Sequence, residues 1–195
     1  RRRHRREISR TVDNNGNESN ISGHYPCDDP SLYSLDTPNN RAVENIVALL
    51  PQYYDHNKSE FTLLFFCAPY CHHSLRFLPK LAHFVHFQNE RYNSSRSGSG
   101  QTNQCTIAMQ CICIPDCSSG IEAKKMLDGT GFYYFPQCHL DPSYTSIKAL
   151  TQIHSIPAVL VVDNVKGNVV TNWGRTAIEF NGDGCIEAWR MGQPG

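Results

Sequence analysis

Cys71 stands at a point of the sequence where a thiol is expected to be reactive. It follows the apolar run 61–67, which has the composition of a buried strand, and precedes residues 74–87, whose apolar side chains recur at helical spacing. Backbone N–H groups and the helix dipole stabilise a thiolate at a helix start, so the pKa of Cys71 should be lowered. His72 and His73 add positive charge beside it. The chain has nine cysteines, and the spacing alone is equally consistent with a Cys71 that has no chemical role.

The residues around Cys71 resemble the active-site segment of a known family. Residues 65–81 read FFCAPYCHHSLRFLPKL. This is similar to the active-site segment of the tryparedoxin and nucleoredoxin branch of the thioredoxin superfamily. The continuous pattern of that family is aromatic-Phe-Ser-Ala-Ser-Trp-Cys-Pro-Pro-Cys-Arg-x-Phe-Thr-Pro-Lys-Leu, where x is any residue. The resemblance implies that Cys71 is the nucleophile and that Tyr70, at the family's Trp position, shapes a substrate groove. His72 and His73 then border the groove and adjust the redox potential.

A second segment, residues 154–159, carries the same resemblance. It reads HSIPAV and is similar to the family's Gly-Ile-Pro-Thr-Leu, which contains a cis-proline beside the nucleophile. Ile156 and Pro157 are therefore implied to line the groove and to pair with the backbone of bound thiol substrates. Residues 163–175 resemble the family's Asp-x-x-Gly-x-Val-x-Thr-x-Asn-Gly-Arg stretch. The resemblance, which runs from about residue 61 to residue 189, implies a thioredoxin-like α/β fold with a central mixed β-sheet flanked by helices.

The sequence departs from the family at the second cysteine, because Ser74 stands there and the motif is Cys-x-x-Ser. In the dithiol mechanism the first thiolate attacks a substrate disulfide and the second thiol releases the mixed disulfide. A hydroxyl cannot perform that release, but it can donate a hydrogen bond to the Cys71 thiolate. We therefore expect a thiol-disulfide oxidoreductase-like protein with Cys71 and Ser74 as catalytic residues. Its mixed disulfides with proteins would be resolved by an external low-molecular-weight thiol or dithiol, such as glutathione or a related thiol.

Two alternatives to this mechanism stay open. The first is a non-catalytic thioredoxin-fold module that binds protein partners through the groove around Tyr70, Ile156 and Pro157 and has lost turnover. The second is an internal resolving cysteine, for which Cys67 is the candidate because it lies at the strand end, four residues before Cys71. A disulfide between them needs Cα atoms within about 7 Å, which the sequence does not establish.

Several cysteines and histidines also raise the question of a metal site. Cys111, Cys113 and Cys117, together with the pair Cys138-His139, supply soft ligands of the kind that zinc binds in a tetrahedron. None of them forms the Cys-x-x-Cys pairs that are typical of structural zinc sites. We expect no metal and no cofactor apart from the external thiol.

The pattern of the chain predicts an α/β sandwich with a mixed sheet, because strands and helices alternate and a β-hairpin follows. The predicted elements are strand 61–67, helix 74–87, strand 105–114, helix 118–127, helix 142–153, hairpin strands 158–163 and 168–172, helix 175–180 and an irregular tail. We interpret residues 1–30 as a flexible basic and polar leader and residues 31–195 as the thioredoxin-like domain. A polar insertion is expected at about residues 89–104, whose side chains offer little to a core.

Composition limits the class of protein and its partners. With 39% hydrophobic and 18% charged residues and no apolar run near 20 residues, the chain is expected neither to be disordered nor to span a membrane. The formal net charge is zero only because five arginines lie among the first six residues. The rest of the chain has 13 basic and 18 acidic residues and is therefore mildly acidic. Nucleic acid is thus an unlikely partner except for the basic leader. An odd number of cysteines without a signal-peptide pattern favours a reducing compartment, the cytoplasm or the nucleus.

Overall fold

The computed structural model describes residues 55–96, 105–135 and 142–195, so the predicted leader lies outside the described residues. Within this part the elements follow one another as the 3-10 helix η2 His56–Lys58, β1 Ser59–Cys67, α2 His72–Arg96, β2 Ile107–Pro115, α3 Gly120–Leu127, β3 Tyr133–Tyr134, α4 Pro142–Thr151, β4 Ala158–Asp163, β5 Asn168–Thr171, α5 Gly174–Asn181 and α6 Gly184–Arg190.

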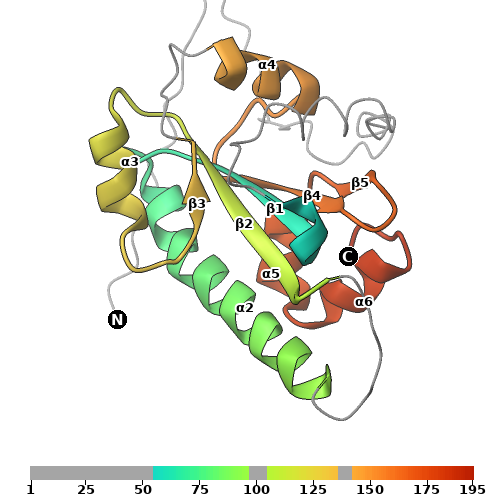
Figure 1. Ribbon diagram of the computed structural model, residues 1–195. Helices are drawn as coiled ribbons and strands as arrows, with labels where there is room; N and C mark the ends of the chain where they lie inside the picture. Colours follow the sequence, from blue (N-terminus) through green and yellow to red (C-terminus); the bar gives the residue numbers. More distant parts are fainter. Residues whose placement is uncertain (1–54, 97–104, 136–141) are drawn as a thin grey trace, which may run out of the picture. The chain divides into compact units, whose positions relative to one another are not determined.

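The five strands form one mixed sheet in the order β3-β2-β1-β4-β5 (Figure 1). β1 lies at its centre, parallel to β2 and antiparallel to β4. Phe65 of β1 is opposite Cys113 of β2 and Val159 of β4, which fixes the register on both sides. β4 and β5 pair antiparallel as the predicted hairpin. The predicted α/β architecture with a mixed sheet flanked by helices is confirmed.

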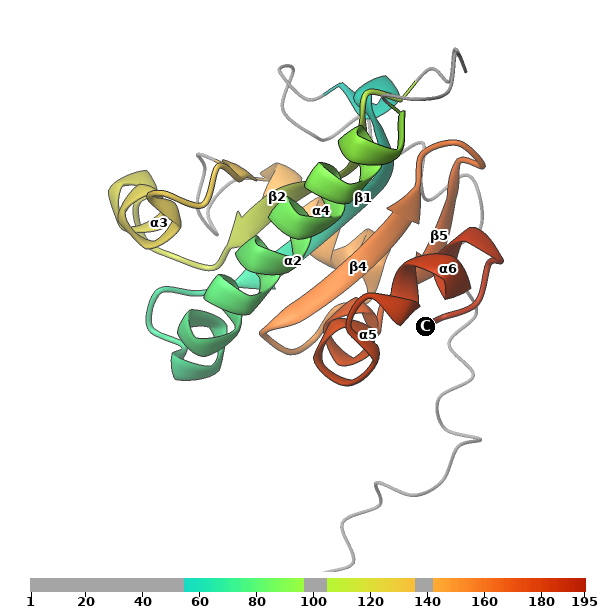
Figure 2. The same cartoon turned by 90° about the horizontal axis from the view of Figure 1, so that it is seen from below.

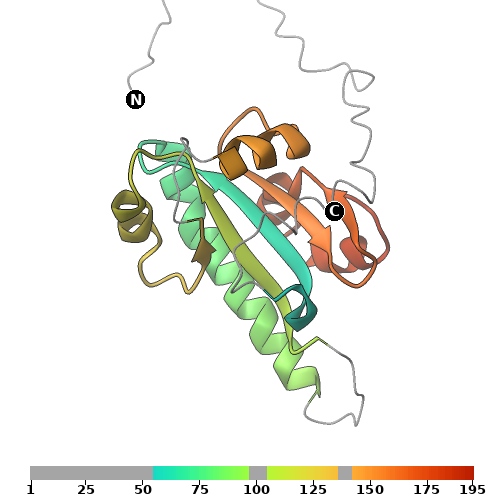
Figure 3. The ribbon, with the colours of Figure 1, turned by 45° about the horizontal axis from the view of Figure 1, so that its top comes forward.

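Helices cover both faces of the sheet, and β1 is buried between them. Phe61, Leu63 and Phe65 point to the core beneath α2, α5 and α6, whereas Leu64 and Phe66 point to the core beneath α4. Figure 2 shows α2, α5 and α6 on one face with α4 behind the sheet, and Figure 3 shows α4 near the start of β4. Burial on both sides explains why residues 61–67 are apolar without alternation.

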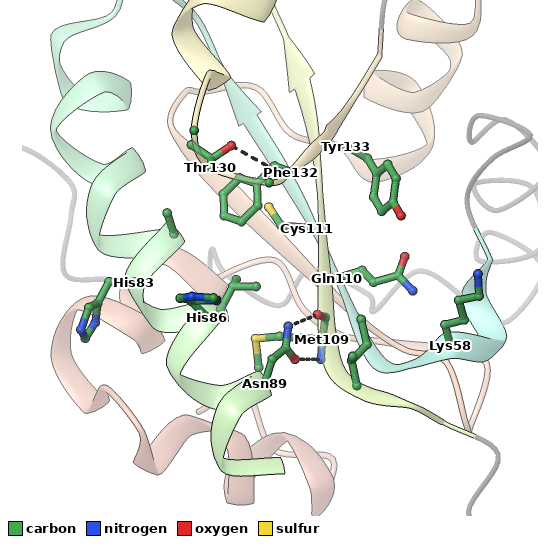
Figure 4. A pocket seen from close by; sticks show the side chains of 15 residues that line it. Lys58, His83, His86, Asn89, Met109, Gln110, Cys111, Thr130, Phe132 and Tyr133 are labelled. Carbon is green, nitrogen blue, oxygen red and sulfur yellow. Dashed lines mark hydrogen bonds between the residues drawn. The ribbon is translucent and has the colours of Figure 1, made fainter. Parts of the chain in front are cut away.

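The polar stretch that we predicted as an insertion is helical as far as Arg96, which corrects the predicted end of the helix at residue 87. Asn89 makes a long-range contact, because its side-chain amide donates to the carbonyl of Met109 at 3.0 Å and accepts from its N–H at 2.9 Å (Figure 4). Ser94 and Ser95 donate to carbonyls one turn back in the helix. Residues 97–104 lie outside the described residues.

The predicted irregular tail contains a further helix, α6, which corrects that prediction. Trp189 is its main core residue, with 0% of its surface exposed. Its ring lies edge-on to Phe61, with centroids 5.8 Å apart, and to Phe84, with centroids 6.2 Å apart. These long-range ring contacts stabilise a seven-residue helix that its own sequence would not support.

The remaining elements agree with the sequence, apart from their ends. Ser119 caps α3 by accepting from the N–H of Glu122, and Gly129 follows the helix with a φ of 77°. α4 ends at Thr151, two residues before the predicted end. The two-residue strand β3 was not predicted. Among the helices in the described ranges, none combines the length and the hydropathy that crossing a bilayer requires.

Gly174 allows α5 to begin directly against β4, and this contact yields a prediction. A Cβ atom at Gly174 would lie 2.7 Å from Cγ2 of Val161 and 2.9 Å from the carbonyl oxygen of Val159. Gly174→Ala should therefore lower the free energy of unfolding by about 1–3 kcal/mol, measured by urea denaturation. Gly184→Ala is the control, since nothing lies within 4 Å of a Cβ there. If the two variants are equally stable, α5 does not pack as closely against β4 at Gly174 as the structure shows.

Candidate active site

Cys71 lies in the turn between the end of β1 and the first turn of α2. Its N–H donates to the carbonyl of Ala68 at 3.1 Å, and its own carbonyl accepts from the N–H of Leu75 at 3.1 Å. The second bond is the first of the helix, so Cys71 occupies the N-cap position. Its side chain is partly exposed. The sulfur is thereby placed at the positive end of α2, as the sequence predicts.

Ser74 lies directly beneath this turn, with 0% of its surface exposed. Its hydroxyl oxygen accepts from the N–H of Ala68 at 3.3 Å, which leaves the hydroxyl proton for the sulfur of Cys71. The hydrogen bond from Ser74 is the main reason that the pKa of Cys71 is lowered. Partial burial opposes the effect, while the N–H groups of Ser74 and His73 and the charge of Arg175 add to it. The Cys-x-x-Ser arrangement thus stabilises a thiolate.

The histidine rings lie at the surface. The side chains of His72 and His73 are both exposed, and their rings meet edge-on with centroids 6.2 Å apart. The contribution of His73 to the lowered pKa of Cys71 comes from its backbone N–H. These two side chains therefore border the site without enclosing it.

The start of β4 lies on the other side of the Cys71 sulfur. The thiol of Cys71 points to the carbonyl oxygen of Ile156 at 4.0 Å, across 85 positions of the sequence. The peptide bond between Ile156 and Pro157 is cis. Ile156 is half-buried and Pro157 is buried. The antiparallel pairing of Phe66 with Ala158 explains why Ile156 lies near the Cys71 sulfur, because it places the start of β4 beside the end of β1.

Arg175 is a site residue that the sequence analysis did not single out. Its Nη1 donates to the carbonyl of Pro157 at 3.5 Å, and its Nε lies 3.2 Å from Oε2 of Glu179. Its guanidinium carbon lies 5.7 Å from the ring centroid of Phe77 in α2. Arg175 follows Gly174 in the stretch that resembles the family's Asn-Gly-Arg. The sequence therefore contained a signal for this residue, but the analysis assigned no role to Arg175. Its positive charge favours the Cys71 thiolate.

Cys67 lies in the core, where its surface is 0% exposed. A hydrogen bond with Cys113, together with burial, raises the pKa of Cys67 far above its ordinary value. Burial also raises the pKa of Cys113. Because the attacking group in disulfide exchange is the thiolate, such a position disfavours Cys67 as a resolving residue.

The soft metal ligands do not converge within the described part of the chain. No three His, Cys, Asp or Glu side chains there could hold a metal ion together, and Cys138 and His139 lie outside it. Cys117 instead donates to the carbonyl of Ser119 at 3.2 Å. A cavity of about 570 Å³ is lined by residues of α2, of β2 and of the segment 129–133 (Figure 4). Cys111 lines it, but none of the residues predicted for the thiol site does.

Tyr70, one of the predicted groove residues, is 72% exposed. It borders a cleft of about 560 Å³ that is lined by Pro69, Tyr70, Asp116, Cys117, Ser118 and Glu122. This cleft lies beside the end of β2, and of the residues predicted to form the groove only Tyr70 lines it. Asp116, at this strand end, is a second residue that the sequence analysis did not single out.

Comparisons with known proteins place this architecture among thioredoxin-like folds. No protein-family model matches the sequence, and no curated protein matches it. Tryparedoxin II from C. fasciculata is 15% identical, with a TM-score of 0.54 over 79% of this chain and 96% of its own. Tryparedoxin II complexed with glutathionylspermidine is 17% identical, with a TM-score of 0.50 over 77% of this chain and 85% of its own. At these low identities the structural similarity shows the fold alone, which is the thioredoxin-like fold that the sequence predicted.

The hydrogen bond from Ser74 leads to a prediction for the ionisation of Cys71. Ser74→Ala should raise the pKa of Cys71, so that alkylation by iodoacetamide, followed by peptide mass spectrometry, requires a higher pH. Loss of the acceptor for the Ala68 N–H should also cost about 1–3 kcal/mol of stability. Ser94→Ala is the control on the same helix, because Ser94 is exposed and bonds only within α2 among the contacts described. A pH profile of Cys71 that Ser74→Ala leaves unchanged would contradict the role of Ser74.

Proposed function

We propose that the protein is a tryparedoxin- or nucleoredoxin-like thiol-disulfide oxidoreductase that works with one nucleophilic cysteine, Cys71. The observation that carries the proposal is the environment of its sulfur. Ser74 and the N–H groups at the start of α2 lower the pKa of Cys71, and the carbonyl of Ile156 lies 4.0 Å from the sulfur. A stabilised thiolate that is partly exposed beside a strand start is suited to attack a disulfide laid across the groove.

The reaction proceeds by two exchanges of sulfur. The Cys71 thiolate attacks one sulfur of a protein disulfide, forms a mixed disulfide with it and releases the other sulfur as a thiolate. An external thiolate then attacks the mixed disulfide, bonds to the substrate sulfur and returns Cys71 as a thiolate. Ser74 stabilises the ionised form before and after the cycle. It takes no part in the second exchange, because a hydroxyl does not form the required disulfide.

Glutathione or a related small thiol is the proposed resolving agent, and protein disulfides are the proposed substrates. Among the similar structures, one tryparedoxin II is complexed with glutathionylspermidine, which supports a small thiol as partner. Cys67, Cys71, Cys111, Cys113 and Cys185 carry free thiols. Free thiols agree with a reducing compartment, and we propose the cytoplasm or the nucleus.

Turnover should be limited by the missing resolving cysteine. Reduction of insulin disulfides with dithiothreitol is expected to be slow, and Ser74→Cys should accelerate it at least tenfold, because a second thiol at this position would release the mixed disulfide within the molecule. The rate of insulin precipitation measures the effect.

Two variants complete this experiment. Cys71→Ser should abolish the activity, and Ser94→Cys, which adds a thiol on the same helix away from the turn, should leave it unchanged. If Ser74→Cys has no effect although Cys71 forms mixed disulfides, another cysteine already resolves them. If Cys71 forms none, the protein is the non-catalytic binding module instead.

A further inference from the structure

The outer side of β2 is only partly paired in the portion of the chain that the structure describes. β2 pairs along its length with the central strand β1, but on the other side β3 pairs with Ile112 and Cys113 alone. We call the outer side of residues 107–111 the β2 edge. It borders the cavity of about 570 Å³, which is lined by Ile107, Met109, Gln110 and Cys111 of this strand (Figure 4). An unpaired strand edge of this kind can add a strand from another chain.

The backbone groups of Met109 point to the β2 edge. The carbonyl of Cys113 accepts from the N–H of Phe135 at 3.0 Å, so the backbone of Cys113 faces the side of β3. Residues two positions apart in a strand direct their N–H and C=O groups to the same neighbour. Cys111, Met109 and Ile107 therefore face this side as well. Met109 is the middle one of the three, and an added strand would have to pair with it.

The side chain of Asn89 already holds both of these groups. Asn89 lies in α2, and its amide donates to the Met109 carbonyl at 3.0 Å and accepts from the Met109 N–H at 2.9 Å (Figure 4). A primary amide carries a donor and an acceptor side by side, so it can pair with a residue as the backbone of a neighbouring strand does. No strand can pair with Met109 on this side until Asn89 is displaced.

A second copy of this chain is the partner that matches the β2 edge. In an antiparallel pair, two residues that lie directly opposite each other exchange both of their N–H···O bonds. Two β2 edges related by a two-fold axis at Met109 would place Met109 opposite the same residue of the other copy. Each copy would then use the two groups that Asn89 now holds. Because β3 begins to pair at Ile112, the contact would be confined to residues 107–111.

We propose that Asn89 caps the β2 edge and so prevents the chain from pairing with a second copy through this edge. The cap satisfies the central N–H and C=O groups within the molecule, and their loss to an interface would leave the Asn89 amide to find new partners. The proposal is independent of the chemistry of Cys71. A contact that only tied α2 to β2 would affect stability alone, whereas a cap also controls self-association.

Sedimentation velocity of the Asn89→Ala variant tests the cap. The variant should form a species of twice the native mass, whose fraction rises with protein concentration from about ten micromolar to about one millimolar. The native chain and the control Ser94→Ala should keep one mass over the same range. Ser94 is the matched control because it lies on the same helix and, among the contacts described, bonds only within α2. A reducing buffer excludes disulfide-linked dimers, since the chain has nine cysteines.

Hydrogen exchange of the Met109 N–H, followed by NMR of the ¹⁵N-labelled chain, shows whether the association uses the β2 edge. In the native chain this exchange should be slow at every concentration, because the donor is bonded within the molecule. In dilute Asn89→Ala it should be at least about tenfold faster, since the acceptor is gone. It should slow again as the concentration rises, because the N–H then pairs with the second copy.

Asn89→Gln is the second variant and keeps the test decisive if Asn89→Ala does not fold. Glutamine favours a helix, but its amide lies one methylene further from the helix and should not match both groups of Met109. It should therefore associate as Asn89→Ala does. A folded variant that stays monomeric at every concentration would overturn the cap, and so would one that associates while its Met109 N–H still exchanges rapidly.

Discussion

Three backbone hydrogen bonds fix the end of β1, and the candidate site depends on them. The N–H of Cys71 bonds to Ala68, that of Leu75 to Cys71 and that of Asp116 to Cys67. They end the central strand in a tight turn and begin α2 at once, so the sulfur of Cys71 lies at the helix start. Because β1 is paired on both sides, the ends of its neighbours arrive at the same place. The parallel strand β2 brings Asp116 there, and the antiparallel strand β4 brings Ile156.

The same type of side chain behaves in opposite ways within a few residues of this turn. Cys71 is partly exposed and receives hydrogen bonds from Ser74, which lower its pKa. Cys67, four residues earlier, lies in the core beside Cys113, and its pKa is raised. The contrast follows from hydrogen bonding and solvation. Ser74 donates to the Cys71 thiolate, whereas the hydrogen bond with Cys113 and burial favour the neutral thiol of Cys67. These interactions explain how two cysteines only four residues apart can differ in the stability of their thiolates.

The sequence was most informative where local signals and burial agree. The apolar strand up to Cys67, the helix start after Cys71, the cap at Ser119 and the β4–β5 hairpin all follow from patterns of a few residues. The end of α2 and the helix α6 could not be predicted this way, because Asn89 and Trp189 obtain their partners from distant parts of the chain. Arg175 and Asp116 were missed for the same reason. Each is placed by strand pairing or helix packing. Asp116 has no local sequence signature, and the resemblance of residues 172–175 to the family's Asn-Gly-Arg did not assign a role to Arg175.

Incubation with glutathione disulfide, followed by peptide mass spectrometry of every cysteine, tests the central claim most directly. At neutral pH, Cys71 should acquire the glutathione adduct first, because its thiolate is stabilised, whereas the pKa values of the core thiols Cys67, Cys113 and Cys185 are raised. The adduct should persist until a free thiol is added, since Ser74 cannot displace it. An adduct that forms first at another cysteine, or one at Cys71 that disappears into an internal disulfide with Cys67, would contradict the account.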